Sequence, residues 1–104
     1  MGFFSNLFKS NTSSINLTEL INEGGFLVDV RSPLEFKSGS VKGAVNIPLD
    51  QISQQIKKFE NKKNIIVFCR SGNRSGQAKR ILEQQGFKNV TNGGTWENVK
   101  KYKH

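Results

Sequence analysis

The single cysteine of this 104-residue chain, Cys69, stands at a position suited to nucleophilic chemistry. It directly follows the apolar run at residues 65–68, which predicts a buried strand, and it precedes a short polar loop and a helix predicted over residues 75–85. Open α/β sheets bind ligands at the carboxyl ends of their strands, and the N-terminus of a helix favours an anion. Cys69 is therefore expected where a negative charge on sulfur is stabilised.

The loop after Cys69 supplies further groups that stabilise a thiolate, which is the nucleophilic form of cysteine. Arg70 and Arg74 add permanent positive charge, and the three residues between them are small or tolerate unusual backbone angles, so their N–H groups can turn inward. We predict that Cys69 is the catalytic residue and is activated by electrostatics, because the loop holds no general base. The predicted substrate-binding residues are Arg70, Ser71, Gly72, Asn73, Arg74 and Ser75. An inert cysteine packed at the end of a strand is the alternative interpretation.

Alternating strands and helices are predicted to position this loop. Apolar runs predict strands over residues 26–30, 44–47, 65–68 and 87–91. Helix signals stand between them: Asn16 with Glu19, Ser32 with Pro33 and Glu35, Asp50 before Ile52, Ile56 and Phe59, and a last helix holding Trp96, Val99 and Tyr102. This alternation predicts an α/β domain over residues 16–104, with a central parallel sheet flanked by helices on both faces. Residues 1–15 are predicted to form an N-terminal tail, whose Phe4 and Phe8 are expected to pack on the domain.

Composition limits the classes of function. The net charge of +8 lies entirely in residues 61–104, which hold 10 basic and 2 acidic side chains. The electrostatic field of these residues would attract anions, and a soluble surface that is simply basic is the other explanation. The basic residues are not interleaved with aromatic ones as nucleic-acid binding would require. One cysteine cannot close an internal disulfide, which favours a reducing compartment and a cytoplasmic location.

The same counts exclude other kinds of site. One cysteine and one histidine, His104, cannot build a zinc site of Cys and His ligands. No apolar run reaches the ~18 residues of a membrane-spanning helix. We therefore expect no metal, cofactor, nucleic-acid partner or membrane span, and nothing in the sequence demands more than a monomer.

Residues 68–75, which read Phe-Cys-Arg-Ser-Gly-Asn-Arg-Ser, resemble the active-site loop of the single-domain rhodanese family of sulfurtransferases. Other stretches resemble the family's signatures in the right order: residues 28–36, 39–48, 86–87 and 92–96. Ser40 departs from the family pattern, which very often has His there, and the spacing from Gly93-Gly94 to Trp96 is shorter than usual. Both departures leave room for an altered substrate preference.

The resemblance implies a rhodanese-like domain and a thiosulfate sulfurtransferase type of enzyme. Cys69 would take a sulfane sulfur from a small anionic donor such as thiosulfate, become a persulfide, and pass the sulfur to a thiol or cyanide acceptor. Arg70 and Arg74 would attract the donor, unless one of them pairs with a carboxylate instead. Asp29 and Arg31 are the predicted supporting pair, either as a structural ion pair or in contact with substrate.

Two other functions use a similar loop. Cysteine-dependent phosphatases of this fold place five residues between Cys and Arg, whereas four separate Cys69 from Arg74, and the smaller ring suits one sulfur atom better than phosphate or arsenate. A sulfur-relay or docking module loaded by a partner protein needs the same persulfide loop as a free-standing enzyme, so the sequence leaves that alternative open.

Overall fold

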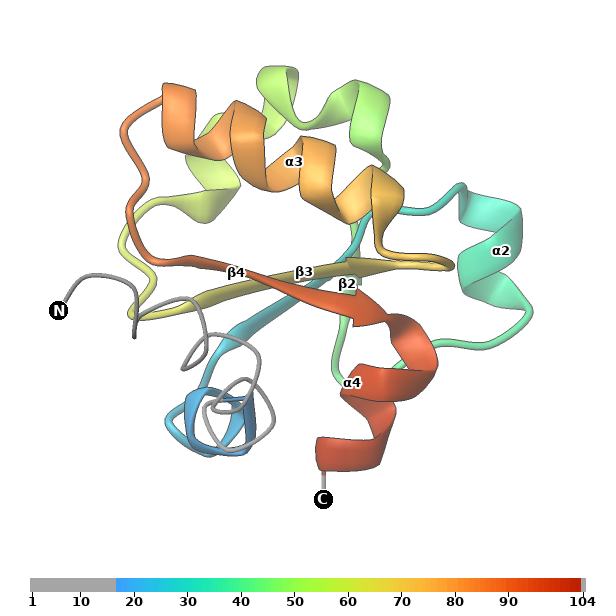
Figure 1. Ribbon diagram of the computed structural model, residues 1–104. Helices are drawn as coiled ribbons and strands as arrows, with labels where there is room; N and C mark the ends of the chain where they lie inside the picture. Colours follow the sequence, from blue (N-terminus) through green and yellow to red (C-terminus); the bar gives the residue numbers. More distant parts are fainter. Residues whose placement is uncertain (1–16, 104) are drawn as a thin grey trace, which may run out of the picture.

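The computed structural model describes residues 17–103, and its centre is a sheet of four parallel strands (Figure 1). The strands are β1 (Phe26–Asp29), β2 (Val45–Asn46), β3 (Ile65–Cys69) and β4 (Val90–Thr95), in the spatial order β2-β1-β3-β4. The predicted α/β fold with a parallel sheet is confirmed. The expected tail and the packing of Phe4 and Phe8 lie outside the described residues. Within residues 17–103, no helix is long and apolar enough to cross a membrane.

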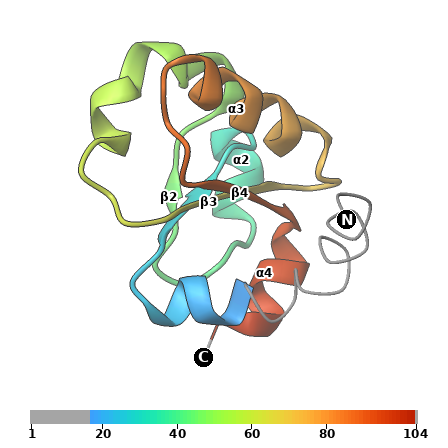
Figure 2. The same ribbon diagram turned by 60° about the vertical axis from the view of Figure 1, so that its left-hand side comes forward.

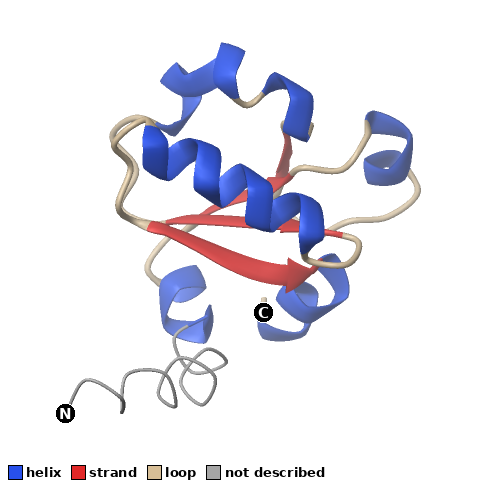
Figure 3. Cartoon of the chain, turned by 45° about the horizontal axis from the view of Figure 1, so that its top comes forward, coloured by secondary structure: helices blue, strands red, loops and turns tan. Residues whose placement is uncertain are grey.

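Helical segments cover both faces of the sheet. One face carries α3 (Asn73–Gln84) and two 3-10 segments, η1 (Leu49–Gln51) and η2 (Ser53–Phe59), while the other carries the helical residues 17–22 and α4 (Trp96–Tyr102) (Figure 3). After a turn of 60° the helix at residues 17–22 and α4 remain together on one side (Figure 2). The short α2 (Pro33–Lys37) lies beside the carboxyl ends of the strands.

The alternation of side chains along β3 determines which way Cys69 points. All five residues of β3 are buried. Ile65, Val67 and Cys69 belong to the core cluster on the α3 side, whereas Ile66 and Phe68 pack with α4 and the helix at residues 17–22. Burying each large aliphatic side chain stabilises the fold by about 1.5–3 kcal/mol, so this alternation is strongly specified. Cys69 is thereby directed toward the first turn of α3.

The helix predicted after Asp50 differs from the structure. Asp50 does not cap an α-helix, because it lies inside η1, whose N-cap is Pro48, and η2 is broken by a non-helical Gln55 (φ −119°, ψ 32°). Ile52 and Phe59 are nevertheless fully buried as the apolar spacing predicted. Short 3-10 turns accommodate the pattern that was interpreted as one helix.

The last strand begins three residues later than predicted and includes the Asn92-Gly93-Gly94 stretch. The pairing of β3 with β4 shifts register between Val67 and Phe68, so that Val67 faces Asn92 and Phe68 faces Gly94. A Cβ on Gly93 would lie 2.6 Å from Val99 Cγ2, which shows that α4 packs directly against the backbone there. Gly93 and Gly94 thus permit a bulged strand packed under a helix. The sequence did not predict this role, because an Asn-Gly-Gly stretch is typical of a turn.

Candidate functional site

The Cys69 sulfur lies at the N-terminus of α3, enclosed by the loop that joins β3 to this helix. Sγ accepts hydrogen bonds from the N–H of Gly72 at 2.9 Å and from the N–H of Ser75 at 3.4 Å, and it lies 3.4 Å from Ser75 Oγ. Gly72 has a left-handed backbone (φ 92°) just before the helix begins at Asn73, two residues earlier than predicted. The loop therefore directs backbone N–H groups at the sulfur, as the sequence predicted.

The pKa of Cys69 reflects two opposed effects. Cys69 is fully buried, and burial raises its pKa because it disfavours the charged thiolate. Hydrogen bonds from the amides of Ser75, Ser71 and Gly72 act in the opposite direction, because they stabilise the thiolate. The net result is a pKa below the ordinary value of a cysteine, so the site favours the nucleophilic form of the sulfur.

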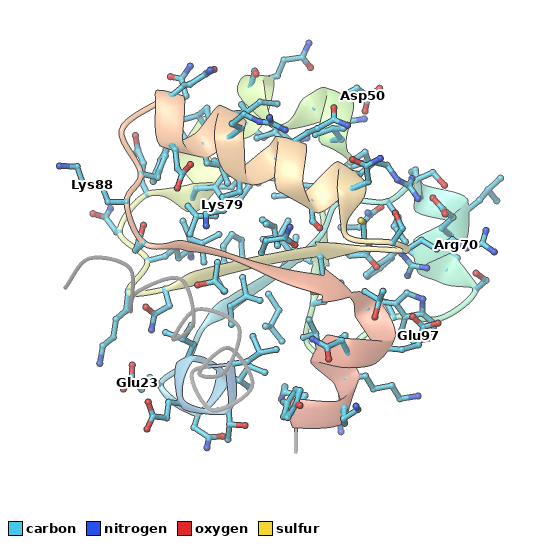
Figure 4. All side chains as sticks on the ribbon, in the orientation of Figure 1. Glu23, Asp50, Arg70, Lys79, Lys88 and Glu97 are labelled. Atoms are coloured by element: carbon cyan, nitrogen blue, oxygen red, sulfur yellow. The ribbon has the colours of Figure 1, made fainter. Side chains whose placement is uncertain are left out.

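Not every loop residue contacts the sulfur. The N–H of Asn73 donates to Ser71 Oγ at 3.3 Å and is thus bonded away from Cys69. Arg70 is exposed, and Figure 4 places it at the outer edge of the molecule beside the turn from β3 to α3. Among residues 17–103 no carboxylate forms an ion pair with Arg70, which leaves its guanidinium available to an anion in solution.

Arg74 is the arginine that pairs with a carboxylate. Its Nη1 and Nη2 donate to the two Glu35 oxygens at 2.8 and 3.0 Å. Glu35 Oε1 also accepts from the N–H of Ser32 at 3.0 Å and so completes the capping box at the start of α2. Arg74 thus ties the first turn of α3 to α2, and the sequence identified Glu35 only as a capping residue.

The Arg74–Glu35 pair predicts a pH dependence of stability. Mainly through Arg74, and also through Ser32, the pKa of Glu35 falls from 4.5 to about 2. A lowered pKa in the folded state contributes stability above pH 4.5 that is lost as the pH falls through about 2. Both side chains are about one-third exposed, so we expect this contribution to be no more than about 1 kcal/mol.

Glu35→Gln retains an oxygen that can cap α2 but removes the charge, so its free energy of unfolding should change less across this pH range than that of the wild type. Urea unfolding at several pH values measures the difference, with Glu83→Gln at an exposed site of α3 as the matched control. Parallel curves for wild type and Glu35→Gln would contradict the prediction.

Asp29 and Arg31 form a buried ion pair at the end of β1. Arg31 Nε donates to Asp29 Oδ1 at 2.9 Å and Arg31 Nη2 donates to Asp29 Oδ2 at 2.7 Å, with Arg31 only 4% exposed. Arg31 also donates to the Gly39 carbonyl at 2.6 Å and lies 5.1 Å from the ring centre of Trp96. Of the two roles that the sequence left open, these contacts favour the structural ion pair.

Ser40, where the family very often has His, belongs to the same network. Its hydroxyl donates to Asp29 Oδ2 at 2.6 Å, so it satisfies the buried carboxylate. This contact ties the Ser40 side chain to the ion pair at the end of β1.

Asn92 is a further residue of the site that the sequence did not indicate. Its side chain contacts Ser75 Oγ at 2.7 Å, the Gly72 carbonyl at 3.2 Å and the N–H of Gly94 at 2.9 Å. The signals were an Asn-Gly-Gly stretch, which is typical of a turn, and the resemblance of residues 92–96 to a family signature. Its place beside Cys69 follows from the pairing of β3 with β4, which the sequence does not reveal.

Comparisons with known proteins agree with this geometry. The family model of the rhodanese-like domain matches residues 14–99. The chain is 38% identical over 74 residues to the thiosulfate sulfurtransferase PspE of Escherichia coli, a match that covers 69% of this chain and 71% of that protein. A solved structure of an E. coli rhodanese with anions has a TM-score of 0.66 and 36% identity, covering 72% of this chain and 91% of that one. A rhodanese-related protein from Thermoplasma volcanium has a TM-score of 0.70 and 31% identity, covering 88% and 91%. The chain therefore belongs to the rhodanese-like domain family.

Proposed function

We propose that the protein is a sulfurtransferase that moves a sulfane sulfur from a small anionic donor such as thiosulfate to a thiol or cyanide acceptor, through a persulfide on Cys69. The observation that carries this proposal is the position of Cys69 Sγ, which lies 2.9 Å from the N–H of Gly72 and 3.4 Å from that of Ser75 at the start of α3. The same donors that favour a thiolate can hold the added sulfur of a persulfide. The family's named sulfurtransferases support the reaction class.

The proposed reaction has two steps and returns the enzyme to its starting state. The Cys69 thiolate attacks the outer sulfur of thiosulfate, a bond forms between the two sulfurs, and the bond within thiosulfate breaks so that sulfite leaves with the electron pair. Cyanide or a thiolate then attacks the terminal sulfur, and the Cys69 thiolate leaves. Each step is a displacement at sulfur, so no oxidant or reductant is consumed.

The burial of Cys69 means that its sulfur must become accessible for this reaction, because the outer sulfur of the donor has to reach Sγ. We expect the loop at residues 70–75 to move, since its amides lie against the sulfur. We expect the N–H of Gly72 to move from Sγ to the added sulfur, since the new bond places that sulfur about 2 Å further out. The exposed Arg70 is the cation that we expect to meet the donor first, because Arg74 is engaged by Glu35.

Mass spectrometry of the protein after incubation with thiosulfate tests the proposal. We expect the peptide that contains Cys69 to gain about 32 Da, one sulfur atom, and to lose it on addition of cyanide with formation of thiocyanate. An unchanged mass with every sulfur donor tested would contradict the proposed function. Slow thiocyanate formation from thiosulfate together with efficient loading by a cysteine desulfurase would instead favour the relay module.

A further inference from the structure

The orientation of the Asn92 side-chain amide is fixed by two backbone groups. Asn92 Oδ1 accepts from the N–H of Gly94 at 2.9 Å, and Nδ2 donates to the carbonyl of Gly72 at 3.2 Å. A backbone N–H can only donate and a carbonyl can only accept, so exchanging Oδ1 and Nδ2 would break both bonds. The atom that lies 2.7 Å from Ser75 Oγ is therefore Oδ1, an oxygen that can only accept.

The Ser75 hydroxyl has one proton and two acceptors within reach. Its Oγ lies 2.7 Å from Asn92 Oδ1 but 3.4 Å from Cys69 Sγ. The proton must lie on the Asn92 side, because two oxygens 2.7 Å apart without a proton between them would repel each other. The contact between Sγ and Oγ is then a hydrogen bond only if the thiol donates its own proton to Oγ.

We propose that Asn92 is a positioning residue that holds the Ser75 proton away from Cys69, so that the Ser75 hydroxyl withholds a hydrogen bond from the thiolate that the loop amides stabilise. When the thiol ionises, its proton passes to solvent and Oγ loses a donor, while the Ser75 hydroxyl stays bound to Asn92. In the persulfide the inner Sγ carries no proton, and the Ser75–Asn92 bond is undisturbed. Any effect of Asn92 on turnover rests on the proposed sulfur transfer. The hydrogen bonds among Cys69, Ser75 and Asn92 are present in the protein without a substrate.

The charged groups near Cys69 lie on other elements than Asn92. Arg74 on α3 interacts electrostatically with Cys69, Arg70 follows it in the loop, and Asp29 pairs with Arg31 at the end of β1. The strand β4, which carries Asn92, has no titratable side chain. An effect of Asn92 on the pKa of the thiol must therefore pass either through the Ser75 hydroxyl or through the shape of the loop.

The pKa of the Cys69 thiol, measured from the pH dependence of alkylation by iodoacetamide, separates these two routes. In Asn92→Ala the Ser75 hydroxyl is free to donate to the thiolate, so we expect the pKa to fall by about half a unit, which gives about threefold more thiolate at a pH well below the pKa. In a protein that already carries Ser75→Ala, adding Asn92→Ala should leave the pKa of the Cys69 thiol unchanged, because no hydroxyl remains to be redirected. The double variant is therefore compared with Ser75→Ala alone.

Two further variants keep the test decisive. Asn98→Ala is the matched control, because Asn98 donates to the neighbouring Gly93 carbonyl at 2.8 Å without contacting Ser75. The pKa of the Cys69 thiol in this variant should equal that of the wild type. Asn92→Asp keeps an accepting oxygen and adds negative charge, so the pKa should rise. An unchanged or raised pKa in Asn92→Ala, an equal shift in the Ser75→Ala background, or a lowered pKa in Asn92→Asp would overturn the proposal. The titration uses no sulfur donor, so an absent persulfide would contradict the proposed function and leave this result standing.

Discussion

Cys69→Ser is expected to abolish thiocyanate formation, with a loss of at least about a thousand-fold in the rate of sulfur transfer. A serine hydroxyl is not ionised at neutral pH, and its oxygen cannot carry the sulfane sulfur in place of Sγ. The N–H groups of Gly72 and Ser75 would still surround the side chain, so the loss would report the missing nucleophile. The measurement pairs the thiosulfate and cyanide assay with the mass of the protein, which should gain no sulfur.

Serine is the better replacement than alanine because Cys69 is fully buried in the core cluster beside α3. Alanine would leave a small cavity there, whereas the serine hydroxyl can use the polar partners that now surround the sulfur. Thermal unfolding and circular dichroism of Cys69→Ser should therefore resemble those of the wild type. If a well-folded Cys69→Ser protein kept a substantial rate of transfer, Cys69 would not be the sulfur carrier.

The sequence predicted the centre of this site because the relevant contacts are local. Cys69, Gly72 and Ser75 lie within seven consecutive residues, and the transition from an apolar strand to a polar loop and a helix is enough to direct the loop amides toward the sulfur. The Ser32–Glu35 capping box was predicted for the same reason, since its partners are three residues apart.

The sequence left open that Arg70 or Arg74 pairs with a carboxylate, but it did not identify the partners that connect this centre to the rest of the fold, because those partners are distant in sequence. Arg74 and Glu35 are 39 residues apart, and Ser75 and Asn92 are 17 apart. The position of Asn92 depends on a register shift between β3 and β4, and residue spacing along one strand carries no information about such a shift. The sequence therefore indicated the loop around Cys69 but not the contacts that Glu35 and Asn92 make with it.

Asp29→Ala is expected to destabilise the folded protein by about 3–5 kcal/mol, because it leaves the Arg31 guanidinium buried without a counter-charge. Arg31 would keep its bond to the Gly39 carbonyl, while Ser40 would lose the oxygen to which its hydroxyl donates. A domain of this size has a total stability of about 5–15 kcal/mol, so this loss would remove a large fraction of it. Urea unfolding measures the free energy of each variant.

Two comparisons show whether the effect arises from the buried charge. Glu23→Ala removes an exposed carboxylate 3.7 Å from Lys63, and such surface pairs contribute about 0–1 kcal/mol. Asp29→Asn keeps an oxygen that can accept from Arg31 and Ser40 but removes the charge, so its loss should lie between those of Glu23→Ala and Asp29→Ala. If Asp29→Ala cost no more than Glu23→Ala, Arg31 would be hydrated or free to leave its site. The ion pair would then not be what fixes the end of β1 beside the strand that carries Cys69.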